Sequence, residues 1–427
     1  MRALGAPSPL TMPLPRPLLD HTATVLAAVL EFKHPADAVV SRYLRAHPVL
    51  GQQDRAFVAE TVFAVLRRLR LLETLTAGRD PRRLVLAALT RLRGLSLREL
   101  DTALKPREHD WLAEIKARAE ENSLAVRCDF PDWLLARLQR QYGERELLAL
   151  AHCLQRSAPL DLRVNLQKAE REAVLARLAA EGIAAQATPY SPVGVRLEGK
   201  PQINRHALFL EGAIEIQDEG SQLLCQLLAP RRGEMVADFC AGAGGKTLAL
   251  GALMRSSGRL YAFDISEKRL AGLKPRLARS GLSNVHPQWI ASENDARLKR
   301  LAGKLDRVLV DAPCTGLGTL RRNPDLKWRQ NEQTLAGYRA KQDVILAAAA
   351  RLVKPGGLLL YATCSLLDEE NAEVVDAFLA AHAQFELLPA NAALAQQRIA
   401  LDTGEYLRLA PHVHGTDGFF AALLAKK

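Results

Sequence analysis

The stretch Asp238–Thr247 has the sequence DFCAGAGGKT, and it starts where the strand-like run Glu234–Phe239 ends. Its glycines let the backbone approach a ligand closely, and the helix expected next would point free N–H groups at that ligand. A phosphate-binding P-loop would need glycine at Cys240, and a dinucleotide fingerprint would need glycine or alanine at Thr247. The loop therefore predicts a ligand site of neither kind.

Strand-like and helical runs alternate from about residue 213 to the end of the chain. After Glu234–Phe239, the strand-like runs are Arg259–Phe263, Asp306–Val310 and Gly357–Tyr361. This alternation is typical of a doubly wound α/β domain with a parallel sheet, in which ligands bind at the carboxyl ends of the strands. We therefore predict a Rossmann-like α/β fold for residues 213–427, with functional residues directly after the strands.

Asp264 ends the second strand-like run. A carboxylate at this point can accept hydrogen bonds from both hydroxyls of a ribose, or it can cap a helix starting near Ser266. The glycine loop upstream favours ribose binding. Nucleoside recognition without a pyrophosphate cradle suits S-adenosylmethionine, which we predict as the cofactor. The predicted cofactor-binding residues are Cys240, Ala241, Gly242, Ala243, Gly244, Gly245, Lys246, Asp264 and Asp311.

Two cysteines follow successive strand-like runs, in Asp311-Ala312-Pro313-Cys314 and in Thr363-Cys364-Ser365. A free cysteine is usually a small buried hydrophobic residue, and we interpret Cys128, Cys153 and Cys225 in that way. Cys314 and Cys364 are instead expected at the rim of the sheet, where ligands bind.

Methylation of cytosine at carbon 5 gives such thiols a task. Carbon 5 is too electron-poor to take a methyl group from a sulfonium directly, but a thiolate that adds to carbon 6 makes it nucleophilic. An acid that donates to ring nitrogen 3 eases this addition, and Asp311 is predicted for that role, which would need a raised pKa. Afterwards the proton on carbon 5 must leave and the enzyme sulfur must be expelled, which Cys314 could assist.

The motif DAPCTG at Asp311–Gly316, followed about fifty residues later by ATCS at Ala362–Ser365, resembles the Sun/Fmu family of RNA cytosine-5 methyltransferases. QDEGSQ at Gln217–Gln222 and TDGFF at Thr416–Phe420 are similar to the same family, so the resemblance covers roughly residues 156–427. It implies that Cys364 is the nucleophile, that Cys314 serves release, and that Lys246 lies near the active site. The family usually has an aspartate after its third strand, where this chain has Ser292 and Glu293, so the adenine contact stays open.

Residues 20–155 are predicted to form an all-helical domain, in which Asp80-Pro81 opens one helix and Asp132 opens another. The segment from Asp54 to Arg68 resembles the RNA-binding domain of the antitermination factor NusB, which bacterial 16S rRNA methyltransferases of the Sun/Fmu family carry. Several arginines are either a solvated helix face or an RNA-facing surface. They are Arg67, Arg68, Arg70, Arg82, Arg83, Arg91 and Arg93.

Two further segments complete the predicted domain organisation. Residues 1–19 are Pro-rich and are expected to be disordered. Residues 156–212 are predicted as a small α+β module with strands at Leu162–Asn165, Gly194–Leu197 and Ala207–Leu210, and a helix that stops near Gly182.

The formal net charge of +11 favours a polyanionic partner. We expect RNA, most specifically 16S rRNA, with a flipped-out or unpaired cytosine as the target. The segment Leu320–Arg329 holds four cations and one tryptophan, which suits phosphates and stacked bases. The alternatives are a tRNA substrate and a non-catalytic RNA-binding protein on a methyltransferase scaffold.

The six cysteines are scattered, with no C-x-x-C pair and no histidine at zinc-ligand spacing. We therefore expect no metal site, and a reducing cytoplasm as the location. The apolar stretch Ala23–Leu30 is too short to span a membrane, so no membrane association is expected. We expect the protein to be a monomer.

Overall fold

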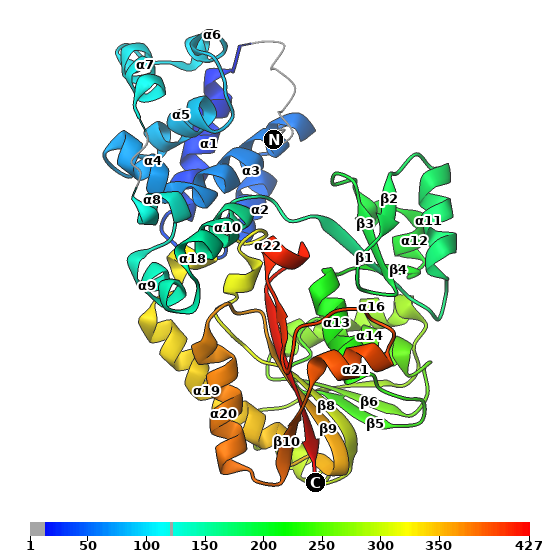
Figure 1. The fold of residues 1–427 in the computed structure, drawn as a ribbon. Helices are drawn as coiled ribbons and strands as arrows, with labels where there is room; N and C mark the ends of the chain where they lie inside the picture. The colour runs from blue at the N-terminus through cyan, green and yellow to red at the C-terminus, as the bar shows by residue number, and fades with distance from the viewer. Residues whose placement is uncertain (1–12, 120–122) are drawn as a thin grey trace. The chain divides into compact units, whose positions relative to one another are not determined.

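The computed structural model describes residues 13–119 and 123–427, which divide into two compact units (Figure 1). Unit 1 comprises Met1–Ser157 together with Leu320–Asn331. Unit 2 comprises Ala158–Thr319 and Glu332–Lys427. The chain therefore leaves unit 2 once and returns to it.

Unit 1 is helical throughout its described residues. Its α-helices are α1 (Arg16–Val29), α2 (Ala36–Ala46), α3 (Gln52–Arg67), α4 (Leu69–Thr76), α5 (Pro81–Arg91), α6 (Leu97–Leu100), α7 (Glu108–Ala117), α8 (Leu124–Cys128), α9 (Asp132–Gln141), α10 (Glu144–Leu154) and α18 (Leu326–Arg329). Helix α5 begins as predicted, because the side chain of Asp80 accepts a hydrogen bond from the backbone N–H of Arg83 and Pro81 occupies the first turn.

The segment predicted to be disordered, residues 1–19, extends too far. Residues 1–12 lie outside the described residues, but Leu14 is fully buried and its N–H donates to the carbonyl oxygen of Glu99 at 2.7 Å. Helix α1 begins at Arg16 and holds Pro17 in its first turn. Proline is tolerated there because the first amides of a helix have no partner within it. The boundary predicted at residue 19 therefore falls inside a helix.

The arginines on these helices make contacts within unit 1. Arg68 pairs with the buried carboxylate of Asp129, and Arg82 forms a two-pronged pair with Glu108. Burial lowers the pKa of Arg67 to about 10. These side chains stabilise the unit, a role that the interpretation as a solvated face or RNA surface had not anticipated.

A four-stranded antiparallel sheet opens unit 2. Its strands are β1 (Leu160–Val164), β2 (Ala185–Ala187), β3 (Gly194–Leu197) and β4 (Ile214–Ile216), in the order β2-β3-β1-β4, with α11 (Arg171–Ala180) and α12 (Ala207–Leu210) beside them. The predicted strands at 162–165 and 194–197 are confirmed. The predicted strand at Ala207–Leu210 is wrong: these residues form α12, and His206 caps it by accepting from the N–H of Leu208. A run of four apolar residues is too short for periodicity to separate strand from helix.

The larger sheet of unit 2 has the strand order β10-β12-β9-β8-β5-β6-β7, and β11 pairs with β12. The strands are β5 (Met235–Asp238), β6 (Arg259–Asp264), β7 (Val285–Trp289), β8 (Leu305–Asp311), β9 (Val353–Thr363), β10 (Phe385–Leu388), β11 (Leu407–Leu409) and β12 (Phe419–Lys426). Strands β5–β9 are parallel, whereas β12 runs antiparallel to β9 and to β10. The predicted Rossmann-like sheet is confirmed, with an antiparallel edge added to it.

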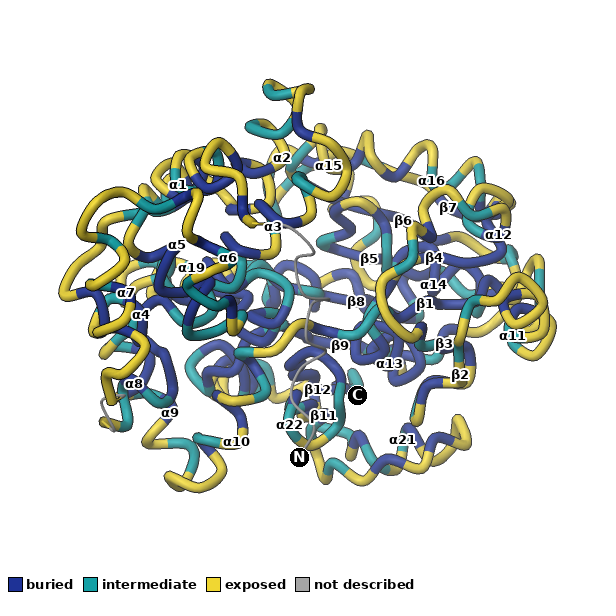
Figure 2. Tube along the Cα trace, turned by 90° about the horizontal axis from the view of Figure 1, so that it is seen from above, coloured by how far each residue is buried: buried dark blue, intermediate teal, exposed yellow. Residues whose placement is uncertain are grey.

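Helices flank this sheet. They are α13 (Glu219–Leu228), α14 (Gly245–Leu253), α15 (Glu267–Ala271), α16 (Leu273–Ser280), α17 (Ala296–Lys299), α19 (Glu332–Ala350), α20 (Ala372–Ala381), α21 (Ala390–Gln396) and α22 (Pro411–His414). Figure 2 shows that β8 and β9 are largely buried, whereas α16 exposes much of its length. The order in which the strands are added reverses at the sheet's centre, between β8 and β5, and the carboxyl ends of the strands form a crevice there in this fold.

The cationic segment Leu320–Arg329, predicted to contact RNA, lies in unit 1 and is largely buried there. The ammonium group of Lys327 donates to the carbonyl oxygens of Arg67 and Asp129 at 3.0 and 2.6 Å. The indole N–H of Trp328 donates to the carbonyl oxygen of Leu66 at 2.9 Å. These two side chains are used inside the helical unit, so their predicted role towards phosphates and bases is wrong. The methyltransferase domain predicted at residues 213–427 therefore also differs from unit 2, because unit 2 excludes Leu320–Asn331.

No helix in residues 13–119 or 123–427 combines the length and the apolar character needed to cross a membrane.

Candidate active site

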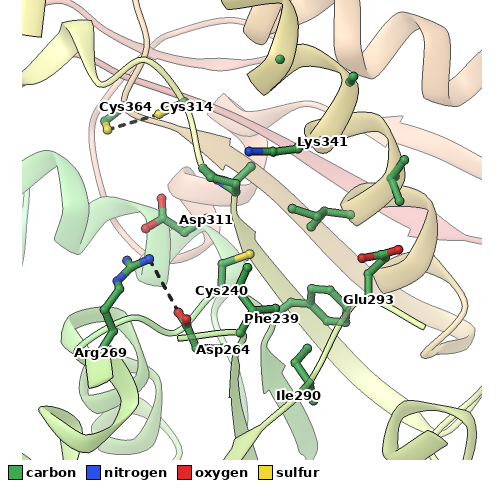
Figure 3. A pocket seen from close by; sticks show the side chains of 17 residues that line it. Phe239, Cys240, Asp264, Arg269, Ile290, Glu293, Asp311, Cys314, Lys341 and Cys364 are labelled. Carbon is green, nitrogen blue, oxygen red and sulfur yellow. Dashed lines mark hydrogen bonds and ion pairs between the residues drawn. The ribbon is translucent and has the colours of Figure 1, made fainter. Parts of the chain in front are cut away.

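A cavity of about 780 Å³ opens at the carboxyl ends of the parallel strands of unit 2 (Figure 3). It is lined by Phe239, Cys240, Asp264, Ile265, Arg269, Ile290, Glu293, Asp311–Cys314, Gly337, Ala340, Lys341, Val344, Ile345 and Cys364. Residues from the ends of β5, β6, β8 and β9 meet there, as expected for a doubly wound sheet. The cavity has the size of a small-molecule site, roughly 300–1,000 Å³.

The glycine loop is tied to Asp264. The N–H of Gly242 donates to one carboxylate oxygen of Asp264 at 2.7 Å, and the N–H of Ser266 donates to the other at 2.7 Å. Gly242 has φ +55°, a conformation that side chains with a Cβ rarely adopt. Ser266, not Asp264, caps α15, because its hydroxyl accepts from the N–H of Arg269. The two backbone bonds therefore orient a buried carboxylate at the wall of the cavity.

Two charged groups at the end of β8 form a close pair. The ammonium group of Lys246, from α14, donates to the carboxylate of Asp311 at 2.6 Å. Burial lowers the pKa of Lys246, but the Asp311 charge and hydrogen bond outweigh it, so that this pKa lies above its usual value. Lys246 is therefore a cation at neutral pH, and its charge stabilises the carboxylate form of Asp311.

Asp238, at the end of β5, lies behind the glycine loop and accepts a hydrogen bond from the hydroxyl of Thr247 at 2.7 Å. Burial raises the pKa of this carboxyl group to about 7, against the opposing effect of that hydrogen bond. Thr247 thus has a structural partner at the position where a dinucleotide fingerprint would need a small residue.

The sulfur atoms of Cys314 and Cys364 lie 3.4 Å apart, within hydrogen-bond distance (Figure 3). The contact with Cys364 and burial both raise the pKa of Cys314 well above that of a free thiol. At this distance an S–H of one cysteine can donate to the sulfur of the other. In the view of Figure 3, Asp311 lies between the two sulfur atoms and the pair formed by Asp264 and Arg269.

The remaining cysteines differ in their surroundings. Burial raises the pKa of Cys128 to about 11 and that of Cys225 to about 12, which makes both thiols inert. Cys240 lines the cavity, and burial raises its pKa as well. Within residues 13–119 and 123–427, no three histidine, cysteine or acidic side chains are arranged to hold a metal ion.

The cavity contains part of the predicted site. Of the predicted residues, Cys240, Asp264, Asp311, Cys314 and Cys364 line it. The residues Ala241–Lys246 are not part of this lining, but Lys246 contacts it through Asp311.

Sequence reasoning missed other residues of the wall. Arg269 lies 3.8 Å from the Asp264 carboxylate, and Lys341 comes from α19. Both are ordinary surface cations in the sequence pattern, and no local signal separates them from their neighbours. Glu293 lines the cavity and Ser292 does not, which separates the two residues left open for the adenine contact.

The side chains that line this cavity fit a nucleoside that carries a sulfonium group. A buried carboxylate with one lone pair left on each oxygen can accept from ribose hydroxyls, and apolar walls from Phe239, Ile265 and Ile290 suit an adenine ring. Together, a Rossmann-like sheet, a glycine loop after its first parallel strand and an acid after its second define an S-adenosylmethionine-dependent methyltransferase.

Comparison with known proteins agrees. A family model described as 16S rRNA methyltransferase RsmB/F matches residues 225–425, and a model of the ferredoxin-like domain of RsmF/B-like methyltransferases matches residues 130–204. The chain is 34% identical to the probable ribosomal RNA small subunit methyltransferase B of Synechocystis sp., over 91% of this chain and 95% of that protein.

Solved structures are similar as well. The crystal structure of PH0851 has a TM-score of 0.80 at 28% identity, covering 97% of this chain and 100% of that one. A methyltransferase homolog from Pyrococcus horikoshii has a TM-score of 0.60 at 30% identity, covering 71% and 98%. The chain belongs to the RsmB/F family of methyltransferases, and it is an S-adenosylmethionine-dependent RNA methyltransferase.

Proposed function

We propose that the protein methylates carbon 5 of a cytosine in 16S rRNA, with Cys364 as the covalent nucleophile. The observation that carries this proposal is the pair of thiols, 3.4 Å apart, in a cavity that also holds the Asp311 carboxylate. A methyltransferase acting on a nitrogen or an oxygen needs no thiol, because those atoms carry lone pairs of their own. Carbon 5 of cytosine needs a covalent adduct before it becomes nucleophilic.

Two carboxylates of the cavity are assigned to cofactor binding. Asp264 accepts from the ribose hydroxyls, and Glu293 replaces the aspartate that the family usually has near the adenine. The loop Cys240–Lys246 supports this site from behind, since its amide at Gly242 fixes the Asp264 carboxylate. When bound, S-adenosylmethionine supplies a methyl group on a positively charged sulfur.

Cys364 is assigned as the nucleophile, since Thr363-Cys364-Ser365 resembles the motif that carries the nucleophile in this family and Cys364 lines the cavity. The Cys364 thiolate adds to carbon 6 of the cytosine, and the resulting enamine makes carbon 5 attack the methyl group. Cys314 gives its proton to the departing Cys364 sulfur, and its own sulfur takes the proton from carbon 5, so that the bond between Cys364 and carbon 6 breaks and the aromatic ring is restored. Cys314 assists this release, since its sulfur lies beside the sulfur that is expelled.

Asp311 and Lys246 are assigned to ring nitrogen 3. Addition of the thiolate places negative charge on the ring, and a proton or hydrogen bond at nitrogen 3 neutralises it. Asp311, which lines the cavity, donates a proton to nitrogen 3 from its protonated form and takes it back when Cys364 leaves. The Lys246 ammonium group, 2.6 Å away, keeps its own proton and stabilises the carboxylate that remains after the donation.

The RNA assignment rests on the relatives. The Synechocystis relative is named as a small-subunit rRNA methyltransferase, and the matching family is described by 16S rRNA. A net charge of +11 agrees with a polyanionic substrate. The cytosine must be unpaired or flipped out to reach the thiols. The helical residues 20–155 are proposed to add to RNA binding.

The proposal is tested by substituting the two thiols separately. Cys364→Ala is expected to abolish methylation of 16S rRNA while calorimetry still detects S-adenosylmethionine binding. Cys314→Ala is expected to trap a protein–RNA adduct, visible as a slow band on a denaturing gel. Methylation by the Cys364→Ala variant would refute the assignment of Cys364 as the nucleophile. If calorimetry detected no S-adenosylmethionine binding to the folded wild-type protein, a non-catalytic RNA-binding role would be favoured.

Bisulfite sequencing of total RNA, with and without the protein, identifies the substrate. A 5-methylcytosine that appears only in 16S rRNA supports the proposal. One that appears only in tRNA would overturn the rRNA assignment and leave the chemistry intact.

A further inference from the structure

Two polar side chains that do not line the cavity are buried beside both cysteine loops. They are Glu370, which is fully buried, and Asn371, which is 3% exposed. Both follow Cys364 closely in the chain, at the end of the turn Asp368–Glu370 and just before α20. The mechanism proposed above uses neither of them.

The carboxylate of Glu370 joins the two loops. One oxygen accepts from the backbone N–H of Thr315 at 2.9 Å, and the other accepts from the hydroxyl of Thr315 at 2.5 Å and from the hydroxyl of Ser365. Thr315 directly follows Cys314, and Ser365 directly follows Cys364. One carboxylate therefore holds the residue after each reactive cysteine.

Gln342, a buried residue of α19, adds a fourth donor to this carboxylate. Its side-chain amide donates to Glu370 at 3.1 Å and to the carbonyl oxygen of Pro313 at 2.9 Å. Pro313 directly precedes Cys314, so the Cys314 loop is held on both sides. Four donors match the lone pairs of an ionised carboxylate, which accepts at both oxygens and donates nothing.

Asn371 holds the other loop in the same way. Its side-chain oxygen accepts from the hydroxyl of Thr363 at 2.6 Å, and its amide donates to the carbonyl oxygen of Ser365 at 3.2 Å. Thr363 and Ser365 flank Cys364. Each cysteine thus lies between two residues that are bonded to the Glu370–Asn371 pair or to Gln342.

We propose that Glu370 is a positioning residue, which fixes the separation of the Cys314 and Cys364 sulfur atoms so that both thiols act on the same base. The part concerning the base rests on the proposed function. The part concerning the separation does not, because the bonds of Glu370 to the two loops exist without RNA. Misplacing a reacting group by about 1 Å costs roughly 100-fold in rate, so a bond network of this kind has a direct catalytic effect.

The test compares wild-type protein with Glu370→Gln, which keeps the side-chain shape. An amide has one acceptor oxygen, so it cannot accept from the N–H of Thr315, the amide of Gln342 and both hydroxyls together. Glu373→Gln is the matched control, because Glu373 carries the same charge on the same segment and is exposed. Thermal melting checks that all three proteins are folded.

The first measurement is binding of phenylarsine oxide, a trivalent arsenical that bridges two neighbouring thiols. Wild-type protein is expected to bind it, and Cys314→Ser is expected to remove that binding. Glu370→Gln is expected to weaken it about tenfold or more, since the separation of the sulfur atoms is no longer fixed. Glu373→Gln is expected to bind as the wild type does.

The second measurement is methylation of 16S rRNA. Glu370→Gln is expected to lower kcat about 10- to 100-fold, with KM for RNA and affinity for S-adenosylmethionine within twofold of the wild-type values. Accumulation of the Cys364 adduct in Glu370→Gln would show that release is the affected step, because Cys314 is then misplaced.

The outcomes separate this inference from the proposed function. Wild-type arsenical affinity in Glu370→Gln overturns the positioning role, whatever the effect on methylation. An unbridged pair in the wild type also overturns it. A third outcome is that Glu370→Gln weakens arsenical binding while the wild-type protein makes no 5-methylcytosine. That outcome supports the positioning of the thiols by Glu370 and refutes only the proposed cytosine chemistry.

Discussion

Asp264 shows how one side chain acquires a fixed direction. Each of its oxygens accepts from a backbone N–H, one in the glycine loop and one at the start of the next helix. Hydrogen bonds to a charged acceptor are stronger than those between neutral groups, so the carboxylate is held without help from a ligand. Preorganisation of this kind lowers the entropy cost of binding.

We therefore expect Asp264→Asn to bind S-adenosylmethionine about 10- to 100-fold more weakly, as measured by calorimetry. The substitution removes the charge-assisted bonds to the ribose, worth roughly 1.5–3 kcal/mol. It also sets an amide N–H₂ against a backbone N–H, which loosens the loop. Glu267→Gln, an exposed neighbour, is the control and should keep its affinity within twofold. Wild-type affinity in Asp264→Asn would exclude the ribose role.

At the residue scale the sequence predicts those side chains whose position follows from a strand end. Asp264, Asp311, Cys314 and Cys364 lie at or just after the ends of three parallel strands, and the topology of such a sheet alone brings them together. Glu370 could not be predicted in this way. It lies in the acidic run Asp368–Glu370, which in a sequence is indistinguishable from a solvated cluster, and only the packing of α19 and the cysteine loops encloses it.

At the scale of elements, the approach of two loops supports the Cys364 turn. The N–H of Gly318 donates to the carbonyl oxygen of Cys364 at 2.8 Å, and the N–H of Gly418 donates to the carbonyl oxygen of Gly318 at 2.9 Å. A Cβ at Gly318 would lie 2.1 Å from the Gly418 oxygen and 2.8 Å from the Cys364 oxygen. Both contacts are with backbone, which cannot move aside as a side chain can. The TDGFF motif thus supports the Cys364 loop through Gly418.

Gly318→Ala is expected to lower the methylation rate about 100-fold and to destabilise unit 2 by about 1–3 kcal/mol, because the added methyl group pushes the Cys364 loop from its place. Initial rates and urea unfolding measure the two effects. Gly78→Ala serves as the control, since no atom lies within 4 Å of its added Cβ. An active Gly318→Ala enzyme would show that the loop tolerates displacement.

Strands that end at turn-forming residues were predictable, whereas α12 and the antiparallel edge of the sheet were not. The runs that became β5, β6, β8 and β9 are apolar and end at turn-forming residues, so the pattern identifies them. The four residues of α12 carry too little periodicity. The antiparallel strands β10 and β12 were not predicted either, because a run such as Phe419–Lys426 does not reveal its direction or its partner.

At the scale of the whole molecule, the chain path links the Cys314 loop to the helical unit. After the Cys314 loop, residues Leu320–Asn331 complete unit 1 before the chain returns to α19. Asp325 accepts from the N–H of Ala36 at 3.1 Å, and Lys327 and Trp328 bond to the ends of α3 and α8. Charged and aromatic residues in a loop look like a nucleic-acid contact, and the sequence offers no sign that unit 1 buries them.

Lys327 gives this connection a measurable pH dependence. Burial is the main cause that lowers its pKa to about 8, with Arg68 and Arg67 adding to the effect and Asp129 opposing it. In the unfolded chain its pKa returns to about 10.4. Below pH 8 the lysine is charged in both states. Between pH 8 and about 10.4 the unfolded chain binds the extra proton, so the free energy of unfolding rises with pH.

We therefore expect the free energy of unfolding of unit 1 to rise by about 2 kcal/mol between pH 7.5 and 9.5 in the wild type, relative to Lys327→Met. The difference arises because methionine has no proton to lose. Lys327→Met also removes hydrogen bonds at every pH, so the two proteins are compared by the change in their free energy of unfolding between the two pH values. Hydrogen exchange of peptides from α3 and α9, followed at both pH values, measures it within unit 1. Lys33→Met, at an exposed lysine of the same unit, should follow the wild type. If the free energy of unfolding rose equally with pH in Lys327→Met and in the wild type, Lys327 would have to titrate near its usual pKa. The segment Leu320–Asn331 would then be open to solvent.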